Sequence, residues 1–567
     1  MSDRNILCLE ENKNYVLKLF RDGEFDYIDA ANEVVEGEFF RFIDAKGYLE
    51  SFAASYPTPR VKEEVPTWFY LAGNFSMRLH GVHAFHAFPY VIRCGGMLNV
   101  FGEKLARKTV HPETGDVTLV CEGFNEKNDY VRQTPCDQDT LRKLAKDTDA
   151  EKLTRWFNHD VPREFKKHHV FDDDGYFIGD ASFIFVPDNP NYEDSARMLF
   201  DEHDHPVDPE KLGGMSKAAA ARCQWRRCYK LVSLLYTDAQ RTFSLRVAAR
   251  LVSGNKHECP IFYELVDQFV ASVGVGVIKR LLLDRGFLDG ERISFCKRKY
   301  GIDILIPVRK NMDIYHDALG MLKSMQLEFR EHKPAVREPV DAPRLPEAPV
   351  RVRKRELSRQ KTIAAKKAEA PSPGSKDVLV RTEVAGMNDF TSWSSCSVPL
   401  SVIYNREVYA DGHEQVWLLL DTRRITKNDP GTRREEYRVR TEIEEGHRQL
   451  KCFWDLSRFT SRAFSLVLNQ IVFVLLTFNL LQLFLRSAGN EKKKELPRRS
   501  RPRQMDRLLV TASVIIIYCG NYFATLDPLE YTEILLTLSE NARQKILAKT
   551  QRLRRVDPRE MLPVRSP

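Results

Sequence analysis

The chain has 567 residues, of which 43% are hydrophobic and 29% are charged. These proportions are typical of a globular protein of two to four domains, and they exclude wholesale disorder, a collagen-like repeat and a polytopic membrane protein. Lys and Arg number 87 against 79 Asp and Glu, a formal net charge of +8, which permits nucleic-acid binding without demonstrating it. Residues 487–567 hold 16 Lys and Arg against nine Asp and Glu, so nearly all of the excess lies in this basic C-terminal segment.

Residues 1–167 mix short apolar periodicities with aromatic runs such as Trp68-Phe69-Tyr70, and we expect a mainly helical N-terminal domain here. The first residues lack the basic and then apolar pattern of a signal peptide, and the 11 cysteines are scattered along the chain. Both features predict a reduced, cytoplasmic protein.

Short β-branched and apolar runs, separated by polar stretches, follow in residues 168–325 and indicate a mixed α/β sheet. The pattern predicts three strands, a helix, a strand, a second helix and a fifth strand, which is the order of the RNase H-like fold. The strands are expected at 176–186, 229–237, 243–252, 277–283 and 302–308, and the helices at 260–273 and 288–300.

An insertion is predicted at residues 326–435. From Glu331 to Lys376 the chain is Pro-rich and charged, a composition that cannot bury a core and predicts a flexible stretch. Strand-like alternation returns at 378–421 and is clearest at 414–420, so a small β-rich element is expected to follow.

Residues 463–485 are uncharged and rich in Leu, Phe and Val, and the run is long enough for a membrane-spanning helix. A helix that is apolar nearly all round is equally expected in the core of a large domain. Four amides interrupt the run: Asn469, Gln470, Asn479 and Gln482. We therefore predict a buried helix in the second part of the sheet domain, residues 436–486. The shorter apolar run at 508–518 predicts another buried helix.

The clearest chemical pattern lies between Tyr437 and Lys451. At about 100° per residue, Tyr437, Arg440, Glu444 and Lys451 share roughly a 60° sector of one predicted helix. A solvated charged helix shows similar pairs and is the alternative. The spacing Tyr-x2-Arg-x3-Glu-x6-Lys resembles the Y-R-E-K signature of bacterial insertion-sequence DDE transposases, the insertion-sequence family numbered four. By position, the resemblance implies that Glu444 is the third metal-binding carboxylate and that Tyr437, Arg440 and Lys451 contact DNA phosphates.

The same resemblance requires two earlier aspartates on the sheet. Asp284 stands between Leu281-Leu282-Leu283 and Arg285-Gly286-Phe287, which is similar to the second-aspartate motif of the family, although Asp284 could also cap the next helix. Asp180 lies within the first predicted strand and precedes Ala181-Ser182, whereas Asp172-Asp173-Asp174-Gly175 is typical of a turn before it. We predict Asp180 as the first ligand, with Asp172 to Asp174 as the alternatives.

Three carboxylates suit phosphodiester chemistry that uses two divalent ions about 4 Å apart, and Mg²⁺ selects carboxylate oxygens. Mn²⁺ is the expected substitute. The resemblance also implies a tryptophan in the β-rich insertion that stacks on a displaced base. Trp417 is predicted for this role over Trp393, and packing in a core is the alternative for both. Basic runs within 492–503 and 552–555 are expected to hold DNA backbone, to contact a second subunit or only to keep the chain soluble.

The resemblance covers residues 172–485. By position, it also implies that the N-terminal domain, residues 1–167, binds DNA ends. It implies a DDE transposase with an RNase H-like core that cleaves DNA at the ends of an insertion sequence and transfers the 3′-hydroxyl into target DNA. Its partners would be double-stranded terminal repeats and target DNA, bound by a homodimer or higher assembly in the nucleoid of a bacterial cytoplasm, without a membrane. The alternatives are an inactive or domesticated DNA-binding relative, a nuclease on the same fold, and a membrane protein anchored by 463–485.

Overall fold

The computed structural model describes residues 13–88, 136–333, 378–487 and 514–554, together with 97, 100–101, 107–110, 113 and 117–120. Residues 26, 32, 63–64, 80, 242, 326, 453, 455, 520–521 and 527 lie outside this description. Most of the predicted flexible stretch, the basic run within 492–503 and Arg555 of the second basic run also lie outside the described residues.

Five strands form the centre of the protein in the order predicted for the RNase H-like fold. They are β4 (Tyr176–Val186), β7 (Gln224–Thr237), β8 (Ser244–Ser253), β9 (Arg280–Leu282) and β10 (Asp303–Pro307). Their order across the sheet is β8-β7-β4-β9-β10, with β7 antiparallel to both β4 and β8, and with β9 parallel to β4 and β10. The connecting helices are α11 (Glu258–Val273) and α12 (Gly290–Phe295), which continues into a π-helical turn at Cys296–Tyr300.

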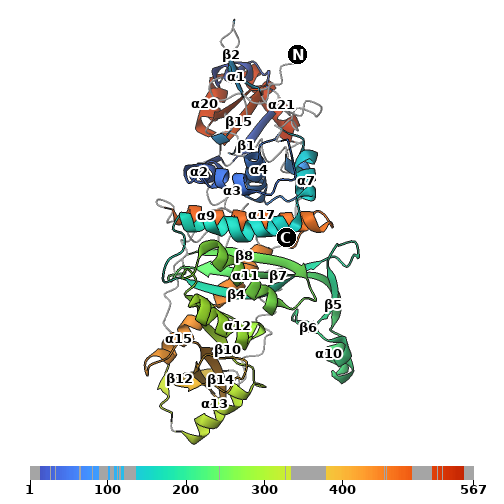
Figure 1. Cartoon of the computed structure of the whole chain (residues 1–567). Coiled ribbons are helices and arrows are strands. Elements are labelled where there is room, and N and C mark those ends of the chain that lie inside the picture. Colours follow the sequence, from blue (N-terminus) through green and yellow to red (C-terminus); the bar gives the residue numbers. More distant parts are fainter. Residues whose placement is uncertain are drawn as a thin grey trace.

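The predicted β-rich insertion extends this same sheet. Strands β12 (Leu379–Phe390), β13 (Leu400–Tyr409) and β14 (Glu414–Asp421) form an antiparallel set, and β14 pairs with β10. At the other side, β5 (Ala196–Phe200) and β6 (Pro206–Val207) extend β7, and the sheet totals 11 strands with β11 (Arg330–Glu331). Figure 1 shows β12 and β14 with α13 (Asp313–Ser324) at one end of the molecule.

The sheet has two apolar faces because successive strand residues point to opposite sides. Phe177 and Leu281 pack into the large core with α11 and the other helices on that side, whereas Ile178 and Leu282 pack into a smaller cluster with Val439 and Ile443. Helices α15 (Asp429–Arg438) and α16 (Thr441–Cys452) therefore cover the second face.

The helix α17 (Phe464–Arg486) is long and apolar enough to cross a membrane, and most of it is buried inside the protein. It lies between the N-terminal helices and β8 (Figure 1). Its amides bond to protein groups: Asn469 Nδ2 donates to Tyr70 Oη at 2.7 Å, and Gln470 Nε2 donates to the Arg458 carbonyl at 2.9 Å. The prediction of a buried helix is confirmed.

The N-terminal region is mainly helical, as predicted. Its helices are α1 (Lys13–Arg21), α2 (Glu33–Ala45), α3 (Tyr48–Ser55), α4 (Thr67–Leu79), α7 (Gln138–Asp147), α8 (Ala150–Arg155) and α9 (Val161–Lys167). A hairpin of β2 (Arg107–Val110) and β3 (Val117–Val120) is also present.

The two ends of the chain share a second sheet. Strand β1 (Tyr27–Ala31) pairs with β15 (Val514–Cys519), which pairs with β16 (Tyr522–Leu526). Figure 1 shows this sheet beside α1, α20 (Pro528–Thr537) and α21 (Glu540–Arg554). The predicted helix at 508–518 is wrong for 514–518, which form β15, because a β-branched run that pairs on both sides favours a strand. Residues 508–513 lie outside the described residues. The predicted domain boundaries stay a prediction.

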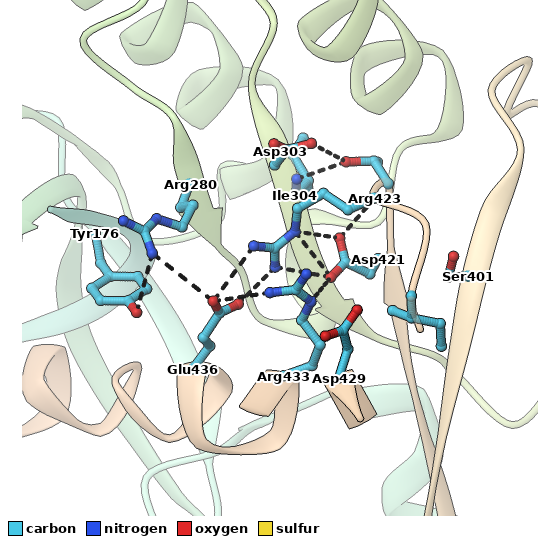
Figure 2. Close-up of polar contacts among 12 residues, drawn as sticks. Tyr176, Arg280, Asp303, Ile304, Ser401, Asp421, Arg423, Asp429, Arg433 and Glu436 are labelled. Carbon is cyan, nitrogen blue, oxygen red and sulfur yellow. Dashed lines mark hydrogen bonds and ion pairs between the residues drawn. The ribbon is translucent and has the colours of Figure 1, made fainter. Parts of the chain in front are cut away.

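A buried ion network fixes α15 to the sheet (Figure 2). The Asp421 side chain is fully buried at the end of β14 and binds Arg423 Nη2 at 2.8 Å and Arg433 Nε at 3.1 Å. Glu436 binds the same two arginines, at 2.7 and 3.1 Å, and lies 3.9 Å from Arg280 of β9. Burial raises the Asp421 pKa, although Arg423 and Arg433 oppose the shift. The network joins β14, β9 and the helix that ends beside Tyr437.

Replacing Gly179 with Ala should destabilise the sheet. The added Cβ would lie 2.7 Å from Leu283 Cδ2 and closer still to the Phe262 ring, and overpacking of this kind costs about 1–3 kcal/mol. The control Gly320→Ala adds a Cβ with nothing within 4 Å on the exposed side of α13 and should raise stability slightly through helix propensity. Urea denaturation followed by circular dichroism compares the two, and an unchanged Gly179→Ala midpoint would contradict the packing described above.

The buried network also predicts a large loss of stability for Asp421→Asn. Removing one partner leaves Arg423 and Arg433 with an uncompensated buried charge, which costs about 3–5 kcal/mol. The matched control is Asp389→Asn, whose ion pair with Arg424 is exposed on both sides and should leave the midpoint close to wild type. Equal midpoints for both variants in urea would show that the network does not stabilise the fold.

Candidate active site

The parallel pairing of β4 with β9 brings the two predicted aspartates side by side. Phe177 pairs with Leu281 and Ile178 with Leu282, so Asp180 and Asp284, two residues further along each chain, stand at the same level. Neighbouring strands lie about 4.8 Å apart. Both aspartates share the side of Ile178 and Leu282, the face that α15 and α16 cover.

Asp284 begins a short 3₁₀ turn immediately after β9, and its Oδ1 accepts a hydrogen bond from the Arg285 amide at 2.6 Å. The alternative considered from the sequence, a cap on the next helix, is not observed: Asp289 caps α12, and Asp284 caps only this short turn. The charge of Asp284 still acts on Tyr437 and Arg440.

Glu444 lies on α16, but the predicted single helix from Tyr437 to Lys451 is wrong. α15 ends at Arg438, α16 begins at Thr441, and Val439 and Arg440 form a turn between them. The turn is tightened by bonds from the Val439 amide to Glu436 O and from the Arg440 amide to Tyr437 O, each 3.0 Å. Val439 and Ile443 are both buried against the sheet, so apolar contacts hold the chain on each side of the turn.

Arg440 is the residue on which the predicted site converges. Its Nη2 lies 2.7 Å from Glu444 Oε1, and its Cζ lies 6.0 Å from the centre of the Tyr437 ring. Burial alone would lower the Arg440 pKa, but Tyr437, Asp284, Glu444 and Asp180 raise it through their charges. Carboxylates from β4, β9 and α16 thus act on one guanidinium.

Tyr437 and Lys451 are the first and the last of the four residues predicted to share one helix face. Tyr437 is the penultimate residue of α15, and burial raises the pKa of its phenol. Lys451, near the end of α16, donates from Nζ to Ser182 Oγ at 2.7 Å. Ser182 follows Asp180 by two residues on β4, so Lys451 contacts the strand of the first aspartate.

Trp417 lies on β14 with its ring centre 6.5 Å from that of Tyr437. Its indole N–H donates to Glu407 Oε1 at 3.1 Å, and the Arg434 guanidinium lies 4.9 Å from the ring centre. The side chain is partly exposed and held on two sides. Both tryptophans also pack on apolar clusters, Trp417 on the smaller cluster of the second face and Trp393 on the large core.

The three alternative aspartates lie before β4, and each has its own cation. Asp172 binds Arg486 at 3.0 Å, Asp173 binds Lys279 at 2.9 Å and Asp174 binds Arg280 at 3.2 Å. None of the three acts on Arg440 among the charges that raise its pKa.

Sequence reasoning missed two residues beside Asp180. His447, three residues after Glu444, has its Nε2 3.4 Å from Asp180 Oδ2, and burial lowers the pKa of its imidazole although Asp180 opposes the shift. The three-residue spacing was a signal that could have found it. Arg246 of β8 is fully buried near Asp180, and no local pattern marks it.

The donor set suits a divalent cation. Among the residues that the structure describes, no three His, Cys, Asp or Glu side chains form a ready metal cluster. Asp180, Asp284 and Glu444 nevertheless offer the hard oxygen donors that Mg²⁺ prefers, and Arg440 already places a positive charge among them. The chemistry of these residues therefore fits a divalent metal ion.

Comparisons with known proteins identify the family. A model described as the transposase DDE domain matches residues 172–480, more than half of the chain. Among solved structures, the chain is similar to the piggyBac transposase in its synaptic complex with hairpin DNA, at 12% identity and a TM-score of 0.32, over 76% of this chain and 69% of that one. A similarity this weak supports no functional argument. The comparison with curated proteins gives no match. On the match to residues 172–480, the chain belongs to the DDE-domain transposases, the enzymes of DNA transposition.

Proposed function

We propose that this transposase cleaves DNA at the ends of an insertion sequence of the family numbered four and transfers the freed 3′-hydroxyl into target DNA. Asp180, Asp284 and Glu444 hold the divalent metal. The observations that support this assignment are the parallel register that sets Asp180 of β4 level with Asp284 just after β9, and the 2.7 Å contact of Glu444 with Arg440, on whose guanidinium the charges of both aspartates also act. Asp180 is favoured over Asp172 to Asp174, because those residues are paired with cations before the strand.

Two Mg²⁺ ions, or Mn²⁺ in their place, would supply the activation of water or a 3′-hydroxyl and the stabilisation of the leaving oxygen. The cationic side chains of the protein bind phosphate groups instead. The Arg440 guanidinium can bind two phosphate oxygens at once. Lys451 adds a positive charge beside β4, the strand that carries Asp180. Because its pKa is raised, Tyr437 remains a neutral hydrogen-bond donor at physiological pH.

The DNA partner is double-stranded, with terminal repeats and target bound by a homodimer or higher assembly. Trp417 is proposed to stack on a displaced base, since the contacts with Glu407 and Arg434 hold its ring beside Tyr437. A reduced bacterial cytoplasm with the nucleoid is the proposed location.

Asp180→Asn, Asp284→Asn and Glu444→Gln should each abolish metal-dependent cleavage, because each removes a charged oxygen donor while keeping the shape of the side chain. The loss should be at least about 100-fold, as for removal of one electrostatic group that acts on the transition state. Gel assays of cleavage and strand transfer on DNA with the flanking ends measure it. Binding of these ends should survive.

The matched control is Asp173→Asn, which removes a carboxylate that is 90% exposed and paired with Lys279. It should cut like wild type. If Asp180→Asn stays active while Asp172→Asn or Asp174→Asn does not, the first ligand is misassigned. A wild type that binds ends and never cuts would favour the inactive, domesticated relative.

Lys451→Met should weaken binding of the ends and lower the slope of log affinity against log salt by about one, because one phosphate contact is lost. Fluorescence anisotropy at several salt concentrations measures the slope. Lys323→Met, on the exposed surface of α13 and outside the proposed DNA-binding residues, should leave it unchanged. A full wild-type slope for Lys451→Met would remove Lys451 from the DNA contact.

A further inference from the structure

Contacts with β7 and with α17 fix the position of Arg246 in the core of the protein. Its side chain is 0% exposed on β8. The pairing of β7 with β8 shifts between Leu234 and Leu235, so that Arg246 pairs with Leu235 while Ala248 pairs with Leu234. Such bulges re-aim a side chain. On the other edge of β8, Asn479 of α17 binds the Arg246 amide and carbonyl at 2.9 and 2.8 Å.

In the described part of the chain, the Arg246 guanidinium has no hydrogen-bond partner: its Nε, Nη1 and Nη2 are all buried without one. Burial lowers the Arg246 pKa to about 10, and the charge that opposes this shift is that of Asp180. Ser233 Oγ, on the residue that pairs with Asp180, is also buried there without a hydrogen bond.

α16 leaves room for this guanidinium with a glycine. A Cβ at Gly446 would lie 2.9 Å from Arg246 Nη2 and 3.0 Å from Nη1. Glycine is a poor residue for a helix interior, so the close approach to Arg246 gives this position a physical reason. Gly446 directly precedes His447 on α16, and His447 Nε2 lies 3.4 Å from Asp180 Oδ2. The Arg246 guanidinium therefore approaches α16 beside the residue that contacts Asp180.

We propose that Arg246 is a positioning residue for Asp180, a built-in counter-charge that holds the first carboxylate in place before metal and DNA arrive. The proposal rests on the role proposed for Asp180. Under this proposal, the two arginines differ in their access to DNA. Arg440 is 19% exposed and available to DNA. Arg246 is enclosed by β8, α16 and α17 and acts only on the Asp180 carboxylate.

Unfolding without divalent ions tests the coupling. In EDTA, Arg246→Met should lower the melting temperature. This loss should be smaller in the Asp180→Asn background, because the loss of the Arg246 charge then leaves no carboxylate at position 180 without a counter-charge. Arg250→Met is the matched control on the same strand, where Arg250 binds Glu151 at 3.0 Å; its cost should be the same in both backgrounds. An equal cost of Arg246→Met in both backgrounds would reduce Arg246 to a packing role and overturn the proposal.

Metal affinity without DNA gives a second readout, measured as free Mn²⁺ by electron paramagnetic resonance. Arg246→Met removes a cation near the site and should tighten Mn²⁺ binding about fivefold to tenfold, while Arg246→Lys, which keeps the charge, should stay within about twofold of wild type. Unchanged or weaker Mn²⁺ binding by Arg246→Met would overturn the proposed counter-charge role of Arg246.

The two proposals fail separately. If Asp180→Asn leaves Mn²⁺ affinity unchanged, Asp180 is not a ligand and the proposed function is wrong at this residue, yet the melting cycle still reports on Arg246. Should Arg246→Met not fold, Arg246→Gln takes its place in both experiments, because it removes the charge and keeps a polar side chain.

Discussion

Mutual repulsion of three carboxylates is the constraint on which the architecture of this site depends. Two unit charges 4 Å apart interact by about 4 kcal/mol at an effective dielectric of about 20. Cations that stand among Asp180, Asp284 and Glu444 reduce this repulsion between β4, the end of β9 and α16. Arg440 supplies one such charge, and the charges of all three acids raise its pKa. Arg246 supplies another beside Asp180.

These cations offset the charges of the carboxylates only if their positions are fixed. The contacts that fix them come from distant parts of the fold. The ion network of Asp421 and Glu436 anchors α15 to β14 and β9 (Figure 2). Arg440 follows directly in the turn after that helix. Because β14 pairs with β10, the inserted strands are continuous with the catalytic sheet, and Trp417 keeps a defined position beside Tyr437.

Local patterns were enough to predict much of this arrangement. Alternation located β4 at 176–186, and the leucine run located Asp284 at the end of β9. The turn at Val439 and Arg440 was not predictable, because charge spacing alone suits an unbroken helix. β15 was also missed, since its apolar run becomes a strand only by pairing with β1, almost 500 positions earlier in the chain.

Arg246 was beyond sequence reasoning for the same physical reason. Arg246 is one of two arginines in a mostly apolar strand and belongs to no motif. Its environment is built by residues far away, including Asn479, which lies 233 positions later. The polar content of α17 has a matching explanation. Asn469 binds Tyr70 of the N-terminal helices and Asn479 binds the Arg246 backbone, so the amides that interrupt an otherwise apolar helix satisfy buried groups on both of its sides. Since an unpaired buried amide or carbonyl costs about 1–3 kcal/mol, replacing either asparagine by leucine would add apolar surface and still weaken the packing between the N-terminal helices and the strand that carries Arg246.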